Sequence, residues 1–213
     1  MTPRQIATFF RRLAAHDPAP QTELDYRSPY TLLVAVILSA QATDVGVNKA
    51  TQALFEVAHD PRAMVALGEA GLQAYIKSIG LYRNKARAII AMSAILLERY
   101  DGQVPRDRAD LESLPGVGRK TANVVLNTAF GEPTIAVDTH VFRVANRTGL
   151  APGNTPLEVE RQLEAKVPKK YARHAHHWLI LHGRYTCKAR KPDCPICPVI
   201  DLCAWPDKTS ALA

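Results

Sequence analysis

The spacing of the apolar residues restricts the fold more than any other feature of the sequence. In the first block, Ile6, Phe9, Phe10 and Leu13 stand at positions i, i+3, i+4 and i+7, which is the pattern of a helix with one buried face. Strand-like alternation is weak throughout. Breaks rich in Pro, Gly, Asp and Asn separate further blocks at about 44–58, 61–67, 70–78, 84–99, 107–114, 118–130, 138–148, 155–166 and 169–183. The sequence therefore predicts an all-α fold with short connections.

One block is apolar on nearly every side. It runs from Leu32 to Leu38 after Pro29, which is suited to a first helical turn, and predicts a central buried helix. The longest apolar run, 30–40, is far shorter than the ~20 residues that span a bilayer. At the N-terminus, Arg11 and Arg12 interrupt the apolar stretch that a signal peptide needs. We expect a cytoplasmic protein with no membrane association.

The charge indicates the class of partner. The formal net charge is +7 and the sequence pI is near 9.4. An excess of this size in a small protein indicates a polyanion such as nucleic acid, although a basic surface can also serve solubility alone.

The segment Leu-Pro-Gly-Val-Gly-Arg-Lys-Thr at 114–121 predicts a tight turn between two helices. Asp107 can cap the first helix, and Gly116 and Gly118 allow the backbone to approach a bulky partner. The unpaired N–H groups of the second helix would form an anion site suited to a phosphate. The alternative is a glycine turn that only joins two packed helices.

Lys120 falls in the first turn of that second helix, where most lysines are surface charges or phosphate contacts. The helix N-terminus and Arg119 disfavour its ammonium form, and a neutral amine is what a nucleophilic lysine requires. Asp138, in Ile-Ala-Val-Asp-Thr-His, reads locally as a helix N-cap. A capped carboxylate is also held rigidly, as a catalytic group must be.

All four cysteines lie in the last 27 residues, as Cys187, Cys194, Cys197 and Cys203. Four thiolates satisfy one [4Fe–4S] cluster or one tetrahedral zinc ion. Only one pair has the C-x2-C spacing that zinc sites usually contain twice, so the pattern favours iron–sulfur. Disulfides come third in a reducing compartment.

The first interval between cysteines is basic. It carries Lys188, Arg190 and Lys191. A loop anchored at both ends by metal ligation would present these cations as a rigid phosphate-binding patch; the alternative is a basic loop without a partner.

Three features occur together: the 114–121 segment, an aspartate eighteen residues after the lysine, and C-x6-C-x2-C-x5-C. Together they resemble the endonuclease III family along the whole chain, including Ser-Ala-Gln-Ala-Thr-Asp at 39–44 and the segment 176–187. The resemblance implies a six-helix barrel domain at about 22–133. It also implies a [4Fe–4S] domain formed by 1–21 with 134–213, and DNA in the groove between the two.

By the same resemblance, Lys120 attacks C1′ of a flipped-out oxidised pyrimidine nucleotide in duplex DNA and forms a Schiff base. β-Elimination then cuts the strand, as it also does at abasic sites. Asp138 would assist the nucleophile and stabilise charge on the sugar. The implied wedge residues, which fill the vacated stack, are Gln41 and Leu81. Implied phosphate contacts are Gly116, Gly118 and His140, and a monomer is expected.

Two rival functions compete with this one. Monofunctional adenine glycosylases resemble the chain in hairpin, aspartate and cluster, but they lack the lysine and carry an extra C-terminal domain. Here Lys120 is present and ten residues follow Cys203. A non-catalytic DNA-binding protein with a structural or redox cluster would explain the charge, hairpin and cysteines. It would leave Lys120 and Asp138 unexplained as a pair.

Overall fold

The computed structural model describes residues 1–209, and within them every regular element is a helix. The chain divides into two compact units, one formed by 22–130 and the other by 1–21 together with the chain from 131 onward. No helix in this described part is long and apolar enough to cross a membrane. The structure divides the chain after residue 130, whereas the sequence predicts a domain boundary at 133, and that boundary stays a prediction.

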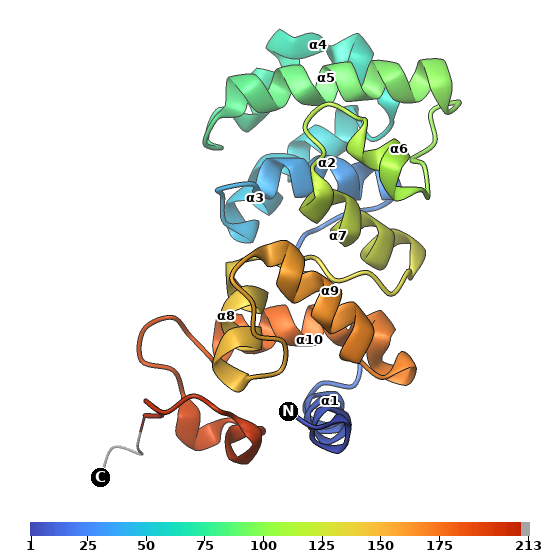
Figure 1. The fold of residues 1–213 in the computed structure, drawn as a ribbon. Coiled ribbons are helices and arrows are strands. Elements are labelled where there is room, and N and C mark those ends of the chain that lie inside the picture. The colour runs from blue at the N-terminus through green and yellow to red at the C-terminus, as the bar shows by residue number, and fades with distance from the viewer. Residues whose placement is uncertain (210–213) are drawn as a thin grey trace. The chain divides into compact units, whose positions relative to one another are not determined.

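The 22–130 unit consists of six helices in the described chain (Figure 1). They are α2 (Pro29–Ser39), α3 (Asp44–Val57), α4 (Pro61–Ile76), α5 (Tyr82–Arg99), α6 (Arg108–Glu112) and α7 (Arg119–Phe130). The sequence predicts two blocks where α4 stands. The reason is Gly68, whose φ of 72° and ψ of 171° interrupt the helix between them.

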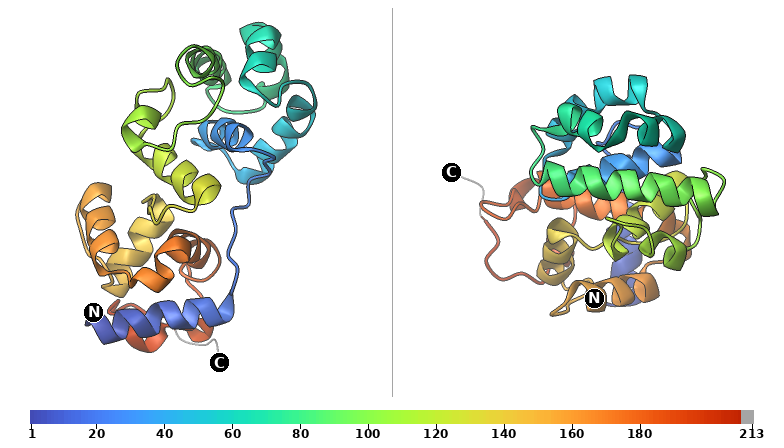
Figure 2. Two further views of the ribbon diagram at one scale, coloured as in Figure 1. Left: turned by 90° about the vertical axis from the view of Figure 1, so that its right-hand side faces the viewer. Right: turned by 90° about the horizontal axis from the view of Figure 1, so that it is seen from above.

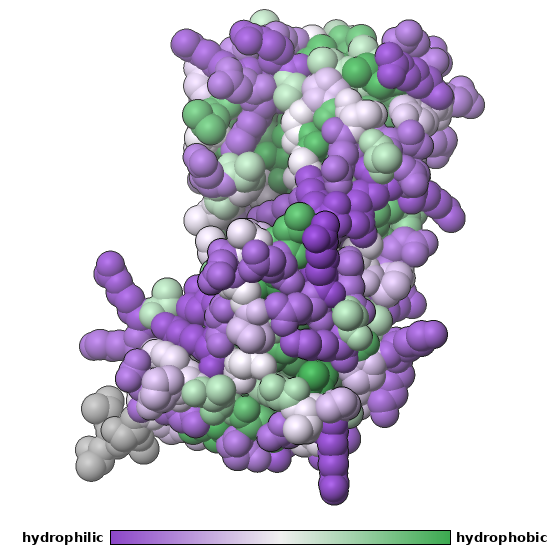
Figure 3. All heavy atoms as spheres, in the orientation of Figure 1, coloured by the Kyte–Doolittle hydropathy of each residue, from purple (hydrophilic) through white to green (hydrophobic). Residues whose placement is uncertain are grey.

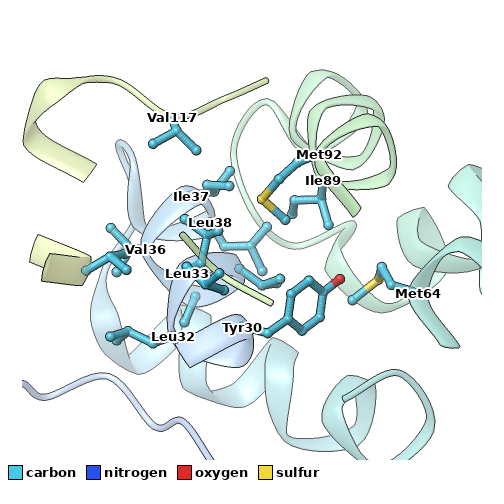
Figure 4. Packing of buried hydrophobic residues seen from close by; sticks show 14 of the residues in the cluster. Tyr30, Leu32, Leu33, Val36, Ile37, Leu38, Met64, Ile89, Met92 and Val117 are labelled. Atoms are coloured by element: carbon cyan, nitrogen blue, oxygen red, sulfur yellow. The ribbon is translucent and has the colours of Figure 1, made fainter. Parts of the chain in front are cut away.

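Helix α2 is the centre of this unit, as its sequence predicts. Every residue from Tyr30 to Leu38 is buried. Ser28 caps the helix in a reciprocal capping box with Thr31, and Pro29 begins it. Figure 4 shows the aliphatic side chains of α2 pointing toward residues of several other segments, among them Met64, Ile89 and Met92. A helix surrounded by α3, α5 and α7 needs apolar residues on all sides.

The second unit joins the N-terminal helix to the C-terminal part of the chain. Its helices are α1 (Pro3–His16), α8 (Thr139–Thr148), α9 (Pro156–Lys166) and α10 (Lys169–Tyr185), with short 3-10 helices η1 (Cys194–Ile196) and η2 (Ile200–Leu202). Helix α1 lies against α10 although more than 150 residues separate them (Figure 2). The Phe10 ring contacts those of Tyr171 and Trp178, with centroids 6.1 and 6.3 Å away. These contacts make residues 1–21 part of this unit.

Polar side chains cover both units, and Figure 3 shows hydrophilic residues over much of each unit on the face that is drawn. The apolar residues gather in two separate cores, one per unit. The all-α prediction is confirmed, and most predicted helix ends agree with the structure to within two residues.

Candidate functional site

The segment at 114–121 forms the turn between α6 and α7. Asp107 caps α6, because its Oδ1 accepts hydrogen bonds from the N–H groups of Ala109 (2.7 Å) and Asp110 (3.1 Å). Gly116 has a φ of +81°, and a Cβ there would lie 3.0 Å from the Cβ of Ala88. Gly116 is thus required by packing inside the protein as well as by its left-handed backbone.

Gly118 differs from Gly116, because a Cβ added to it would have no atom within 4 Å. The buried Val117 between them anchors the turn in the core on the side of α2 that carries Ile37 (Figure 4). Within residues 1–209, the backbone N–H groups of Gly118 and Lys120 have no hydrogen-bond acceptor. An open approach and unpaired N–H groups at the start of a twelve-residue helix are what an anion site needs.

Lys120 is exposed in the first turn of α7. Its neighbour Arg119 extends toward α6, where its guanidinium lies 3.9 Å from the Glu112 carboxylate. The two adjacent cations therefore have different surroundings: Arg119 pairs across the turn, and Lys120 is accessible to a partner.

Asp138 is the N-cap of α8, as its local sequence predicts. Its Oδ1 accepts hydrogen bonds from the N–H groups of His140 and Val141, both at 2.8 Å. The cap uses one carboxylate oxygen and fixes the orientation of the other. His140 is partly buried, and the Arg143 guanidinium lies 3.2 Å from its Nδ1.

Gln41 and Leu81 share an unusual conformation. Both are exposed and non-glycine, and both have a left-handed backbone, with φ of 56° and 59°. Leu81 is 59% exposed, which is high for a large apolar side chain. Gln41 follows the end of α2, and Leu81 immediately precedes α5. Sequence reasoning gave no sign of these strained conformations.

The four cysteines line one pocket in the 1–21/131-onward unit. The pocket encloses about 330 Å³ including its open mouth, and its other walls include Pro192, Ile200 and Trp205. All four thiols are free of disulfides. Burial raises the pKa of Cys197 to about 11, and ligation to iron would deprotonate this thiol.

The donor set around this pocket is four cysteine sulfurs, which a [4Fe–4S] cluster requires. In the part of the chain that the structure describes, no three His, Cys, Asp or Glu side chains form a group that could hold one metal ion. A zinc site brings its thiolates close around one atom, whereas a cubane with four irons keeps its ligands further apart. The donor set therefore fits the predicted iron–sulfur group.

Two arginines of α8 hold the loop that begins at Cys187. Arg143 donates from Nε to the carbonyl of Cys187 (2.9 Å), and Arg147 donates to the carbonyls of Lys188 (2.7 Å) and Ala189 (3.0 Å). Sequence reasoning missed both residues. Their four-residue spacing on α8 places them on one face, but only the fold shows that this face meets the loop.

The three cations of that loop are not equivalent. Arg190 and Lys191 are exposed, and Lys191 has a left-handed φ of 47°. Lys188 instead forms an ion pair with Asp193, at 2.7 Å. Arg190 and Lys191 are thus better placed than Lys188 to meet a phosphate.

Known proteins match nearly the whole length of the chain. Residues 34–169 match the model of the "HhH-GPD superfamily base excision DNA repair protein", and residues 187–203 match the "iron-sulfur binding domain of endonuclease III". The chain is 61% identical to endonuclease III of Escherichia coli K12 over 92% of this chain and 93% of that one. It is also 61% identical to endonuclease III of Treponema pallidum, over 93% of this chain and 94% of that one.

The chain belongs to the endonuclease III family. A solved structure described as a trapped endonuclease III–DNA covalent intermediate superposes with a TM-score of 0.89. It is 49% identical and covers 96% of each chain. The protein is a base-excision-repair DNA glycosylase and AP lyase, and its partner is DNA. Its cofactor is a [4Fe–4S] cluster, and the matched iron–sulfur domain spans the four cysteines.

Proposed function

We propose that Lys120 is the nucleophile of this glycosylase and lyase. Its amine attacks C1′ of a flipped-out nucleotide, and the bond from C1′ to the base breaks. The resulting imine makes the proton at C2′ acidic, so that β-elimination breaks the bond to the 3′ phosphate oxygen. The observation that carries this proposal is the exposed position of Lys120 in the first turn of α7, beside unpaired N–H groups that can hold a phosphate.

Asp138 acts on the same nucleotide in this proposal. It accepts the proton of the attacking amine and stabilises the positive charge that develops on the sugar. The two bonds to its Oδ1 support the role, because they fix a carboxylate without neutralising it. Lys120 and Asp138 belong to different units, so their joint action rests on the family rather than on a distance.

The DNA contacts follow from the exposed features. Gly116 and Gly118 present the start of α7 to a phosphate, and Arg190 and Lys191 supply the charge of a second contact, with Lys188 less available. His140 contributes a further phosphate contact. These groups would contact only the sugar–phosphate backbone of the DNA, so they would bind DNA without recognising its base sequence.

The substrates in this proposal are oxidised pyrimidines in duplex DNA, together with abasic sites. In this proposal Gln41 and Leu81 enter the stack when the damaged nucleotide leaves it, and both are exposed residues with a left-handed backbone. The enzyme acts as a monomer in the cytoplasm, at the nucleoid where its substrate lies.

Product analysis tests the substrate class. We expect the protein to cut a labelled duplex at a thymine glycol or an abasic site and to leave a β-elimination product. A duplex with normal thymine at the same place should stay intact. Release of the base without strand cleavage would overturn the lyase step, and efficient cleavage of normal thymine would overturn the proposed substrate class.

A substitution at Asp138 separates catalysis from capping. Asparagine caps helices as well as aspartate does, so Asp138→Asn should retain α8 and the thermal stability of the protein. Removing the charge should slow base excision about 100-fold or more. An equal loss in Asp138→Asn and in an uncapped Asp138→Ala variant, accompanied by unfolding of both, would reduce Asp138 to a structural cap.

A further inference from the structure

Lys85 connects the two segments that carry Gln41 and Leu81. Its side chain is only 7% exposed, which is unusual for a lysine. Its ammonium donates hydrogen bonds to the carbonyls of Leu38 (2.9 Å) and Ala40 (2.6 Å). Ala40 is the C-cap of α2 and the residue immediately before Gln41.

These carbonyls are among those that a helix leaves without a partner at its C-terminus. A cation at this end of a helix is favoured by the helix dipole as well. The ammonium of Lys85 therefore fixes the direction in which the chain leaves α2, and with it the left-handed residue Gln41.

The first turn of α5 joins the same residue to the other segment through an ordinary helical backbone bond. Leu81 is the N-cap of α5 and makes no side-chain cap, and its carbonyl accepts a hydrogen bond from the N–H of Lys85 at 3.1 Å. The two segments are also neighbours, because a Cβ added to Gly80 would lie 3.8 Å from the carbonyl oxygen of Gln41. One residue thus contacts the chain next to both exposed, left-handed side chains.

Packing alone does not account for a lysine at this place. The buried face of α5 is otherwise formed mainly by apolar residues such as Ala86, Ile89 and Met92. Desolvation by this burial lowers the pKa of Lys85, because a buried site disfavours the charged form. A buried charge is costly unless hydrogen bonds compensate it, and here both bonds go to the end of α2.

We infer that Lys85 is a positioning residue that holds the Gln41 and Leu81 segments in one fixed arrangement, ready for insertion into the DNA stack. The role rests on the proposed function, in which these two side chains enter the duplex. Rigid wedges reduce the cost of separating a paired nucleotide from its stack, so the contribution of Lys85 depends on whether the damaged base is paired.

The test compares two duplexes under single-turnover conditions. In one, thymine glycol faces adenine; in the other, it faces an abasic analogue, so that no opposite base has to be separated. We expect Lys85→Met, which keeps the apolar stem and removes the donors, to lower the ratio of the two rates (paired over unpaired) at least tenfold. The rate on the unpaired duplex should change less than threefold.

Tyr30→Phe is the matched control. It removes another buried hydrogen bond of the same unit, between the Tyr30 hydroxyl and Ser93 at 2.6 Å, away from both segments. This variant should keep the native ratio, even if its melting temperature falls as far as that of Lys85→Met. Leu81→Ala should lower the ratio, and combining it with Lys85→Met should add little, since both act at one step.

Each outcome decides the matter. An unchanged ratio in Lys85→Met, or the same change in Tyr30→Phe, would overturn the positioning role and leave Lys85 a stabilising residue. If Lys85→Met does not fold, Lys85→Gln retains one donor and should give an intermediate ratio; failure of both to fold would also make Lys85 purely structural. Inactivity of the native protein on both duplexes would instead overturn the proposed function, and this role with it.

Discussion

The two units achieve a rigid structure in different ways. The 22–130 unit surrounds one apolar helix, α2, with a continuous core of aliphatic side chains. The other unit has a core richer in aromatic residues, and arginines tie its segments together: Arg12 donates to the carbonyl of Pro198, and Arg143 and Arg147 to the cysteine loop. The C-terminal segment of this unit contains only the short helices η1 and η2 and buries little apolar area. Polar contacts and a metal cluster therefore contribute more to its stability.

Substitution of Cys197, which we propose as a cluster ligand, should produce the largest difference between the units. Cys197→Ser should abolish the brown chromophore and lower the melting temperature of the 1–21/131-onward unit by about 15 °C or more, because its C-terminal segment depends on metal ligation. Hydrogen exchange, read separately for each unit, checks this. Equal loss of protection in α2 would contradict the view that the cluster stabilises mainly its own unit.

A cavity in the core of the 22–130 unit should have the opposite effect, and destabilise that unit more than the unit with the cluster. Leu33 is fully buried, and Leu33→Ala should lower the free energy of unfolding by about 3–4 kcal/mol through lost burial and an unfilled cavity. Chemical denaturation monitors the loss, and the absorbance of the cluster should remain until the other unit unfolds. Early loss of this absorbance would show that the two units unfold together.

Acid should affect the units unequally, because six of the seven histidines lie in the unit with the cluster. Burial lowers the pKa of His177 from 6.5 to about 4. The unfolded chain therefore binds a proton that the folded chain does not, and stability falls as the pH decreases from about 6.5 to 4. The loss should be on the order of 2–3 kcal/mol from this residue, on the basis of 1.36 kcal/mol per pKa unit.

Hydrogen exchange between pH 7 and 4 measures this effect in each unit. The 22–130 unit contains only His59, whose side chain is 62% exposed, and should change little over the same range. A His177→Gln variant should have a flatter pH dependence. If the 22–130 unit lost more stability than the other unit as the pH decreased, this explanation would be contradicted.

Arg147→Met should have a smaller effect, on DNA binding. The loop with Arg190 and Lys191 would lose two of its anchors, and the dissociation constant for undamaged duplex should rise about fivefold at moderate salt. Arg161→Met on α9 removes the same charge from an exposed position of the same unit. If both variants bind DNA equally well, only net charge matters and the anchoring of the loop does not.

The sequence was sufficient for features that depend on nearby residues. The helices, the caps at Asp107 and Asp138 and the buried α2 follow from periodicity and capping, which act over a few positions. The kink at Gly68 also appears in the sequence as a break between two blocks. The cluster site could be predicted as well, because its four cysteines are close together in the sequence.

The contacts that hold the candidate site together could not be predicted in this way. Lys85 meets the end of α2 across 45 and 47 positions, and Arg143 meets Cys187 across 44. Nothing local distinguishes these cations from solvent-exposed ones. The left-handed conformations of Gln41 and Leu81 are equally hidden, because neither residue type favours them.

Borohydride trapping is the most direct test of the assignment of Lys120. Native protein mixed with duplex containing thymine glycol and then reduced should give a covalent protein–DNA adduct, with the DNA attached to the peptide that contains Lys120. Lys120→Ala should give none, whereas Arg119→Ala, which removes the adjacent cation, should still give it. An undiminished adduct in Lys120→Ala, from protein that retains its cluster, would contradict the central claim and assign the nucleophile to another amine.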